Sequence, residues 1–98
     1  MQSFRVALAQ MNSTVGDIDG NLAQIVDLCC QARDVQQARV VVFPELAVTG
    51  YPPEDLLLRR DFIASSTAGL LSLCGRINGI CAVIGHPHQQ ENRLYNAA

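Results

Sequence analysis

The stretch from Val40 to Leu57 constrains the fold of this 98-residue chain more than any other part of it. Its first four residues, Val40 to Phe43, are apolar and mostly β-branched, which predicts a short buried strand. Pro44 has no N–H to donate to a sheet, so we expect the strand to end there. The next residue, Glu45, is an isolated acid. Because open α/β folds place functional groups at the carboxyl ends of strands, Glu45 is a candidate catalytic residue.

Patterns typical of strands and helices alternate along the chain, which predicts an α/β fold. Strands are expected at residues 4–10, 39–43 and 80–85, long helices at about 20–37 and 61–77, and a short helical piece at 56–58. The first strand, first helix and second strand form a βαβ unit, so these strands should be parallel. Residues 86–92 have the composition of a polar loop. A fourth strand at 93–98 is expected to pair antiparallel with the third.

In the first long helix, Leu22, Ile25 and Cys29 share an apolar face, and Asn21 and Gln24 are expected on the solvent side. All helices are expected on one face of the sheet. The opposite face would then be bare and apolar, carrying residues such as Val6, Val41 and Val83 or their strand neighbours.

Residues 43–57 read Phe-Pro-Glu-Leu-Ala-Val-Thr-Gly-Tyr-Pro-Pro-Glu-Asp-Leu-Leu. A strand that ends in Phe-Pro-Glu resembles the nitrilase (carbon–nitrogen hydrolase) superfamily. The longer string is similar to the amino-terminal glutaminase domain of glutamine-dependent NAD synthetases. The resemblance implies that residues 1–98 are the amino-terminal piece of a single glutaminase domain. It also implies that they form the opening portion of a four-layer αββα sandwich.

The resemblance gives Glu45 the role of general base. In this family the glutamate takes a proton from a cysteine thiol, which attacks an amide carbonyl, and a lysine stabilises the oxyanion. Glu45 is therefore expected at the carboxyl end of the second strand, beside the end of the first, mostly buried and close to Tyr51. Tyr51 has two interpretations, which are a wall of the glutamine pocket and a turn residue packed on the following helix.

The chain departs from the family because all seven of its basic residues are arginine and none is lysine. Its cysteines, Cys29, Cys30, Cys74 and Cys81, lie in predicted helices and a predicted buried strand, where a small packed side chain is the expected role. The resemblance therefore implies that the lysine and the cysteine nucleophile lie beyond Ala98. The 98-residue polypeptide alone is expected to be inactive and poorly stable. The absent lysine also leaves open a non-catalytic α/β scaffold.

For the parent protein, the resemblance implies hydrolysis of L-glutamine to glutamate and ammonia. A carboxy-terminal synthetase domain of the same chain would use the ammonia, with ATP and magnesium, to amidate nicotinic acid adenine dinucleotide to NAD. The amidase chemistry itself needs no cofactor, and the family implies a homo-oligomer. The alternative enzyme is a stand-alone amidase of the same superfamily that acts on another amide.

Composition argues against several other functions. The net charge of −2 gives no electrostatic reason to bind nucleic acid or anionic membrane. No apolar run approaches the roughly 20 residues of a membrane span. The cysteine spacing fits neither a zinc site nor a disulfide framework, which favours reduced thiols in the cytoplasm. His86 and His88 alternate in sequence, but no third ligand is evident, and no metal site is predicted.

Overall fold

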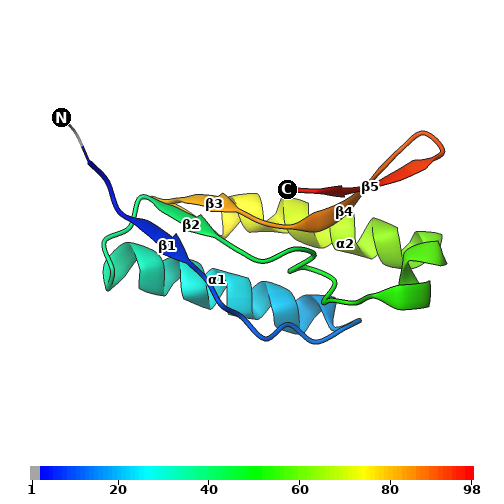
Figure 1. The fold of residues 1–98 in the computed structure, drawn as a ribbon, viewed down its shortest axis with the longest axis horizontal. Helices are drawn as coiled ribbons and strands as arrows, with labels where there is room; N and C mark the ends of the chain where they lie inside the picture. Colours follow the sequence, from blue (N-terminus) through cyan, green and yellow to red (C-terminus); the bar gives the residue numbers. More distant parts are fainter. Residues whose placement is uncertain (1–2) are drawn as a thin grey trace.

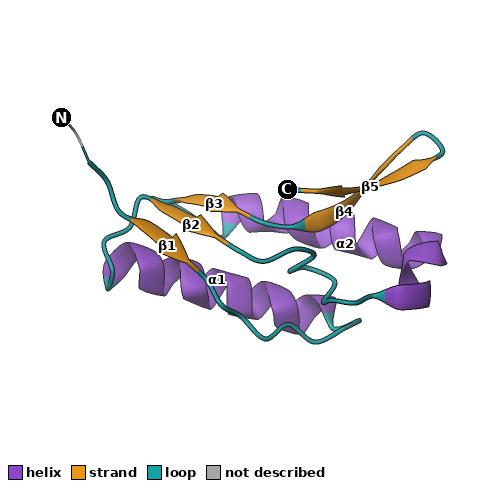
Figure 2. Cartoon of the chain, viewed as in Figure 1, coloured by secondary structure: helices purple, strands orange, loops and turns teal. Residues whose placement is uncertain are grey.

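The computed structural model describes residues 3–98. A three-stranded parallel sheet packs against two helices, and a two-stranded hairpin follows it in the chain (Figure 1). Figure 2 shows the same arrangement by secondary structure. In chain order the elements are β1 (Val6–Leu8), α1 (Ile18–Asp34), β2 (Val40–Val42), the 3₁₀ helix η1 (Glu54–Leu58), α2 (Arg60–Ser72), the 3₁₀ helix η2 (Leu73–Gly75), β3 (Cys81–Val83), β4 (His86–Gln90) and β5 (Arg93–Ala97). The predicted α/β class is confirmed.

The sheet has the order β1-β2-β3, and both strand pairs are parallel, as the βαβ pattern predicts. Ala7, Val41 and Ala82 form one row across the three strands and belong to the core that the helices cover. Val41, in the central strand, is only 1% exposed. The small side chains of Ala7 and Ala82 on either side of it allow the helices to approach the sheet closely.

The other face of the sheet is apolar and uncovered. Val6, Leu8 and Val83 are 47%, 76% and 38% exposed. Val6 is in register with Val40, and Leu8 and Val83 are both in register with Val42. The prediction of a bare face is confirmed for Val6 and Val83. It is wrong for Val41, because neighbouring residues of a strand point to opposite faces and Val41 points to the helices.

The hairpin corrects the prediction for residues 86–98. Residues 86–90 form the strand β4 rather than a loop, and β5 pairs antiparallel with β4 rather than with β3. Glu91, at a φ of 57°, allows the tight reversal between the two strands. The polar composition of β4 reflects its position, because its last three residues face solvent and Pro87 is its buried residue.

Within residues 3–98, neither α1 nor α2 has the combination of length and apolarity that crossing a bilayer requires.

Candidate functional site

Glu45 lies in the loop that follows β2, at the carboxyl end of the central strand, as predicted. The end of β1 lies beside the end of β2, as predicted, because the Ala9 N–H donates to the Val42 carbonyl oxygen at 2.9 Å, and the end of β3 lies on the other side. The Phe43 N–H donates to the Val83 carbonyl oxygen at 2.8 Å, and the chain then turns. A Cβ at Gly85 would lie 2.6 Å from both the Pro44 carbonyl oxygen and the Leu46 nitrogen. A glycine at position 85 therefore allows the loop that carries Glu45 to lie against the end of β3.

The loop is buried on both sides of its solvent-facing tip. Pro44 and Glu45 are exposed, whereas Leu46 to Gly50 are buried, with Ala47, Val48 and Thr49 at 0% exposure. Leu46 has a φ of 51°, a conformation that costs energy for a residue with a side chain. Such strain persists where surrounding packing enforces it, and it is common at functional sites. The apolar residues after Glu45 thus act as an anchor that holds the carboxylate at the surface.

Asn21 ties this anchor to α1. Its side-chain amide donates to the carbonyl oxygens of Thr14 and Val48, at 2.8 and 2.9 Å, and its Oδ1 accepts from the Thr14 N–H at 2.8 Å. Asn21 is only 1% exposed, so its predicted position on the solvent side of the helix is wrong. The reason is that two loop backbones cover the first turn of α1 and need a buried polar partner.

The predicted burial of Glu45 is also wrong, because its side chain is exposed. Burying a lone carboxylate is costly without a cation, and within residues 3–98 no arginine forms an ion pair with it. Its partner is instead Asn96 of β5, whose Nδ2 donates a hydrogen bond to Glu45 Oε1. Glu45 makes no hydrogen bond to Tyr51 in the described part of the chain. Sequence reasoning missed Asn96, since no motif connects the two positions.

Tyr51 is 62% exposed and follows Gly50 at the end of the anchor. Its peptide bond to Pro52 is cis. Exposure to this extent does not fit the interpretation of a turn tyrosine packed on the next helix.

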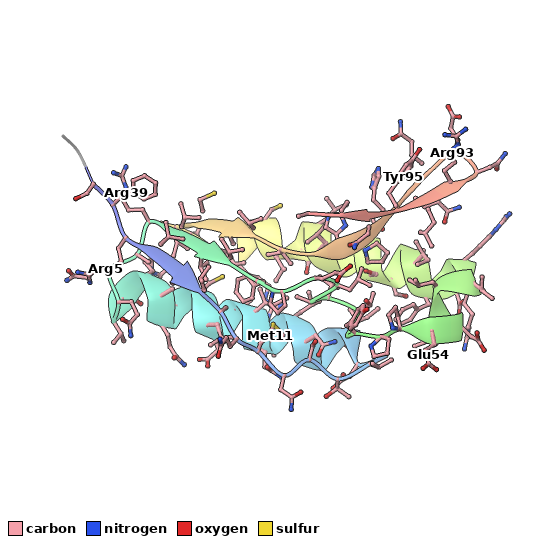
Figure 3. The ribbon with its side chains drawn as sticks, viewed as in Figure 1. Arg5, Met11, Arg39, Glu54, Arg93 and Tyr95 are labelled. Carbon is pink, nitrogen blue, oxygen red and sulfur yellow. The ribbon has the colours of Figure 1, made fainter. Side chains whose placement is uncertain are left out.

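A small hollow lies beside Asn96. It has a volume of about 140 Å³. It is lined by Leu46, Leu57, Pro87, Leu94, Tyr95 and Asn96. The loop that carries Glu45, the 3₁₀ helix η1 and the β4–β5 hairpin therefore meet next to the Glu45–Asn96 pair. Figure 3 shows Tyr95 and Arg93 on the hairpin, pointing away from the helices.

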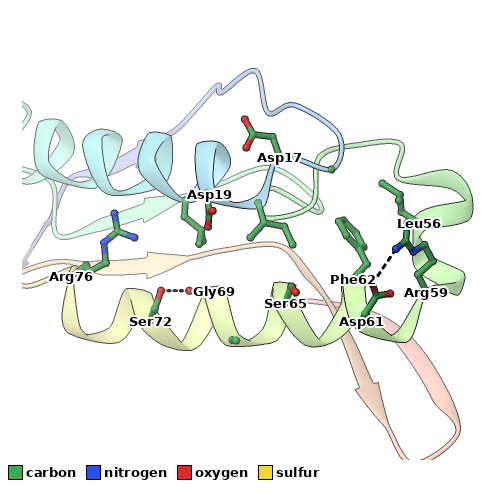
Figure 4. Close-up of a pocket in the computed structure, with 14 residues that line it drawn as sticks. Asp17, Asp19, Leu56, Arg59, Asp61, Phe62, Ser65, Gly69, Ser72 and Arg76 are labelled. Atoms are coloured by element: carbon green, nitrogen blue, oxygen red, sulfur yellow. Dashed lines mark hydrogen bonds and ion pairs between the residues drawn. The ribbon is translucent and has the colours of Figure 1, made fainter.

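A larger groove lies elsewhere, between the start of α1 and α2, with a volume of about 760 Å³ (Figure 4). Asp17 and Asp19 line one side, and Arg76 and the Arg59–Asp61 ion pair, at 3.0 Å, line the other. Neither Glu45 nor Tyr51 borders it. This groove is therefore not the site of the predicted chemistry, despite its size.

The four cysteines are free thiols. Cys29 is buried and Cys30 is half-buried, but Cys74 and Cys81 are exposed, so the prediction of a packed position is wrong for the last two. Cys81 is exposed because it lies on the uncovered sheet face, in register with Val40. Cys81 is the first residue of β3, whereas Glu45 follows the carboxyl end of β2. Because the two strands are parallel, Cys81 and Glu45 lie toward opposite ends of the sheet.

We expect the Cys29 thiol to resist alkylation in the folded protein. Burial, with a smaller contribution from Cys30, raises its pKa from 9.0 to about 11, which lowers the thiolate fraction near pH 8 by about 100-fold. The folded state keeps a proton that the unfolded chain loses between these values, so Cys29 should reduce stability as the pH rises through that window. Iodoacetamide labelling at pH 8, followed by peptide mass spectrometry with and without denaturant, measures this. Equal labelling of Cys29 in both states would contradict the prediction.

The rings of His86 and His88 are perpendicular, with their centroids 6.3 Å apart. Within residues 3–98, no group of three His, Cys, Asp or Glu side chains is arranged to hold a metal ion.

This fold and the Phe-Pro-Glu loop are those of a carbon–nitrogen hydrolase. The family model of that name, carbon-nitrogen hydrolase, matches residues 5–98. The chain belongs to this family.

Among its curated relatives, the chain is similar to glutamine-dependent NAD(+) synthetases. It is 43% identical over 96 residues to the protein of Xanthomonas campestris and 45% identical over 95 residues to that of Xylella fastidiosa. These matches cover 98% and 97% of this chain but 17% of each relative. The chain thus spans about one sixth of the length of the relatives it matches.

Solved structures agree with this result. A glutamine-dependent NAD+ synthetase from Acinetobacter baumannii, in complex with ADP, matches with a TM-score of 0.88 and 38% identity. That match covers 97% of this chain and 18% of that one. An amidase from Nesterenkonia matches with a TM-score of 0.72 and 27% identity over 89% of this chain and 33% of that one. The likeness to the synthetase is closer in both sequence and structure.

Proposed function

We propose that this chain is part of a glutaminase domain that hydrolyses L-glutamine to glutamate and ammonia. The ammonia would serve the ATP-dependent amidation of nicotinic acid adenine dinucleotide to NAD. The observation that carries the proposal is the closer match to glutamine-dependent NAD synthetases than to the amidase, along the whole described chain. The long string around Glu45 supports the same assignment.

In this proposal Glu45 is the general base. Its carboxylate is exposed at the carboxyl end of β2 and accepts a hydrogen bond at Oε1, so Oε2 is available to a thiol. A base must come within hydrogen-bonding distance of the proton that it removes, and an exposed carboxylate on an anchored loop meets that requirement. Tyr51 is proposed to form a wall of the glutamine pocket, since most of its side chain is free to contact a substrate.

The remaining parts of the reaction are proposed to come from residues outside these 98. The chain has no lysine for the oxyanion, and Cys81 lies at the amino end of β3, away from the Glu45 end of the sheet. We assign residues 1–98 to the amino-terminal portion of one domain, followed by a synthetase domain that binds ATP and magnesium. The parent protein is proposed to be a cytoplasmic homo-oligomer. The apolar sheet face with Val6, Leu8 and Val83 is the surface that the rest of a four-layer domain would cover.

We predict that the full-length polypeptide forms NAD from nicotinic acid adenine dinucleotide, ATP and glutamine, and releases glutamate in the process. The 98-residue polypeptide alone should release none, because two partners of the catalytic set are absent. Glutamate release and NAD formation are measured in parallel, with ammonium as an alternative nitrogen source. Hydrolysis of simple aliphatic amides without NAD formation would instead support the stand-alone amidase. Turnover of glutamine by the 98-residue polypeptide would contradict the assignment of the missing residues.

A further inference from the structure

We infer that Asn96 is a positioning residue for Glu45, and that it orients the carboxylate for proton transfer. The inference rests on the proposed function and adds a residue to that site. Its basis is the hydrogen bond from Asn96 Nδ2 to Glu45 Oε1, which joins residues 51 positions apart in the chain.

The bond has a direction that suits a base. An Asn amide NH₂ group only donates, so Glu45 Oε1 is the acceptor in this bond. With Oε1 engaged, rotation of the carboxylate is restricted and Oε2 is left to receive the proton. A donor that bonds one oxygen thus selects which oxygen reacts.

Both partners are held by rigid parts of the fold. Asn96 is paired in register with Pro87, a fully buried residue of β4, so the hairpin is anchored next to the amide. Glu45 is held by the buried residues that follow it and by the close approach of its backbone to Gly85. Catalytic groups placed by rigid elements keep the orientation that the reaction requires.

A purely stabilising role does not account for this contact. Both side chains are exposed, and a hydrogen bond in that setting contributes little to net stability. The contact also fills no core position. Its consequence is therefore the orientation of the Glu45 carboxylate, and a variant that lacks it should fold normally.

The test uses the full-length protein with Asn96→Leu, which keeps the approximate shape and removes the donor. We expect kcat for glutamine to fall between about 10- and 100-fold with KM changed less than about threefold, because a misdirected base slows the chemical step. Asn96→Asp should be more impaired than Asn96→Leu, because it places a second carboxylate beside Glu45. Ammonium-driven NAD formation and the thermal midpoint should match those of Gln90→Leu, an exposed control on the same hairpin.

A double variant tests whether Asn96 acts through Glu45 or affects the reaction independently of it. In the Glu45→Gln background, Asn96→Leu should cause no further loss, since the two residues act through the same step. Wild-type kinetics in Asn96→Leu, or full additivity in the double variant, would overturn the inference while leaving the proposed function intact. A wild-type protein without glutaminase activity would instead overturn the proposed function. In that case, a crystal structure of the full-length protein decides whether Asn96 positions Glu45, and a separation beyond hydrogen-bonding distance would reject it.

Discussion

Glutamine hydrolysis by the full-length protein is expected to fall at least about 1000-fold when Glu45 is replaced by glutamine. Glutamine has nearly the same shape as glutamate and can still occupy the position beside Asn96, but it cannot take up a proton at neutral pH. General base catalysis alone contributes about 10²- to 10⁴-fold, and the members of a nucleophile–base set are not additive. The measurement is glutamate release under saturating glutamine, with ammonium-driven NAD formation followed in the same preparation.

Glu54→Gln is the matched control for this experiment. Glu54 is an exposed acid in the same sequence string, in the first turn of η1, and within residues 3–98 its side chain makes no hydrogen bond to Glu45 or Asn96. Its replacement should change glutamine turnover less than about threefold, since a surface charge of this kind has only a weak effect at a distance. Unchanged ammonium-driven activity in Glu45→Gln shows that the variant is folded. Glutamine turnover above one tenth of the wild-type rate in Glu45→Gln would contradict the role of base.

The second large effect is expected for Asn21→Leu, which should reduce the free energy of unfolding by about 3–5 kcal/mol. Three hydrogen bonds are lost, each with a net contribution of about 1 kcal/mol, and the Val48 carbonyl loses a partner in a buried setting. The loop that carries Glu45 should also loosen, because Val48 belongs to its anchor. Denaturant unfolding of the full-length protein measures the first effect, and the kcat for glutamine measures the second.

Gln24→Leu provides the comparison on the same helix. The Gln24 amide also bonds to the neighbouring loop, at 3.2 Å to the Asn12 carbonyl oxygen, but this single contact is exposed to solvent. Its loss should cost less than about 1 kcal/mol. Similar losses of stability in the two variants would show that the buried amide of Asn21 has no special role.

Several features followed from local sequence because their causes are local. The β-branched run at 40–42 and Pro44 set the end of the central strand, and the βαβ order set the parallel sheet. Other features could have been predicted from the sequence but were predicted incorrectly. Asn21 lies four residues before Ile25 and eight before Cys29, which is the spacing of the buried face of α1. It was nevertheless predicted to face solvent, because its side chain is polar.

The surroundings of Glu45 depend on contacts between distant segments. Gly85 contacts the loop because β3 lies beside β2, and Asn96 reaches Glu45 because β4 and β5 form a hairpin rather than an extension of the sheet. No local pattern encodes these pairings, since an exposed strand such as β4 is rich in polar residues and resembles a loop in sequence. For the same reason, the exposure of Glu45 was not predictable from its apolar neighbours.

The sequence by itself determined that this chain is an α/β protein with an acid after its central strand, and that it belongs with carbon–nitrogen hydrolases. Strand propensity, proline and a long motif act over a few residues, so they can be read without coordinates. Only the tertiary structure decided that the carboxylate is exposed, that Asn21 anchors its loop and that Asn96 donates to it. These outcomes depend on which backbones and side chains meet after folding, and pairings between residues up to 51 positions apart leave no periodic trace in the chain.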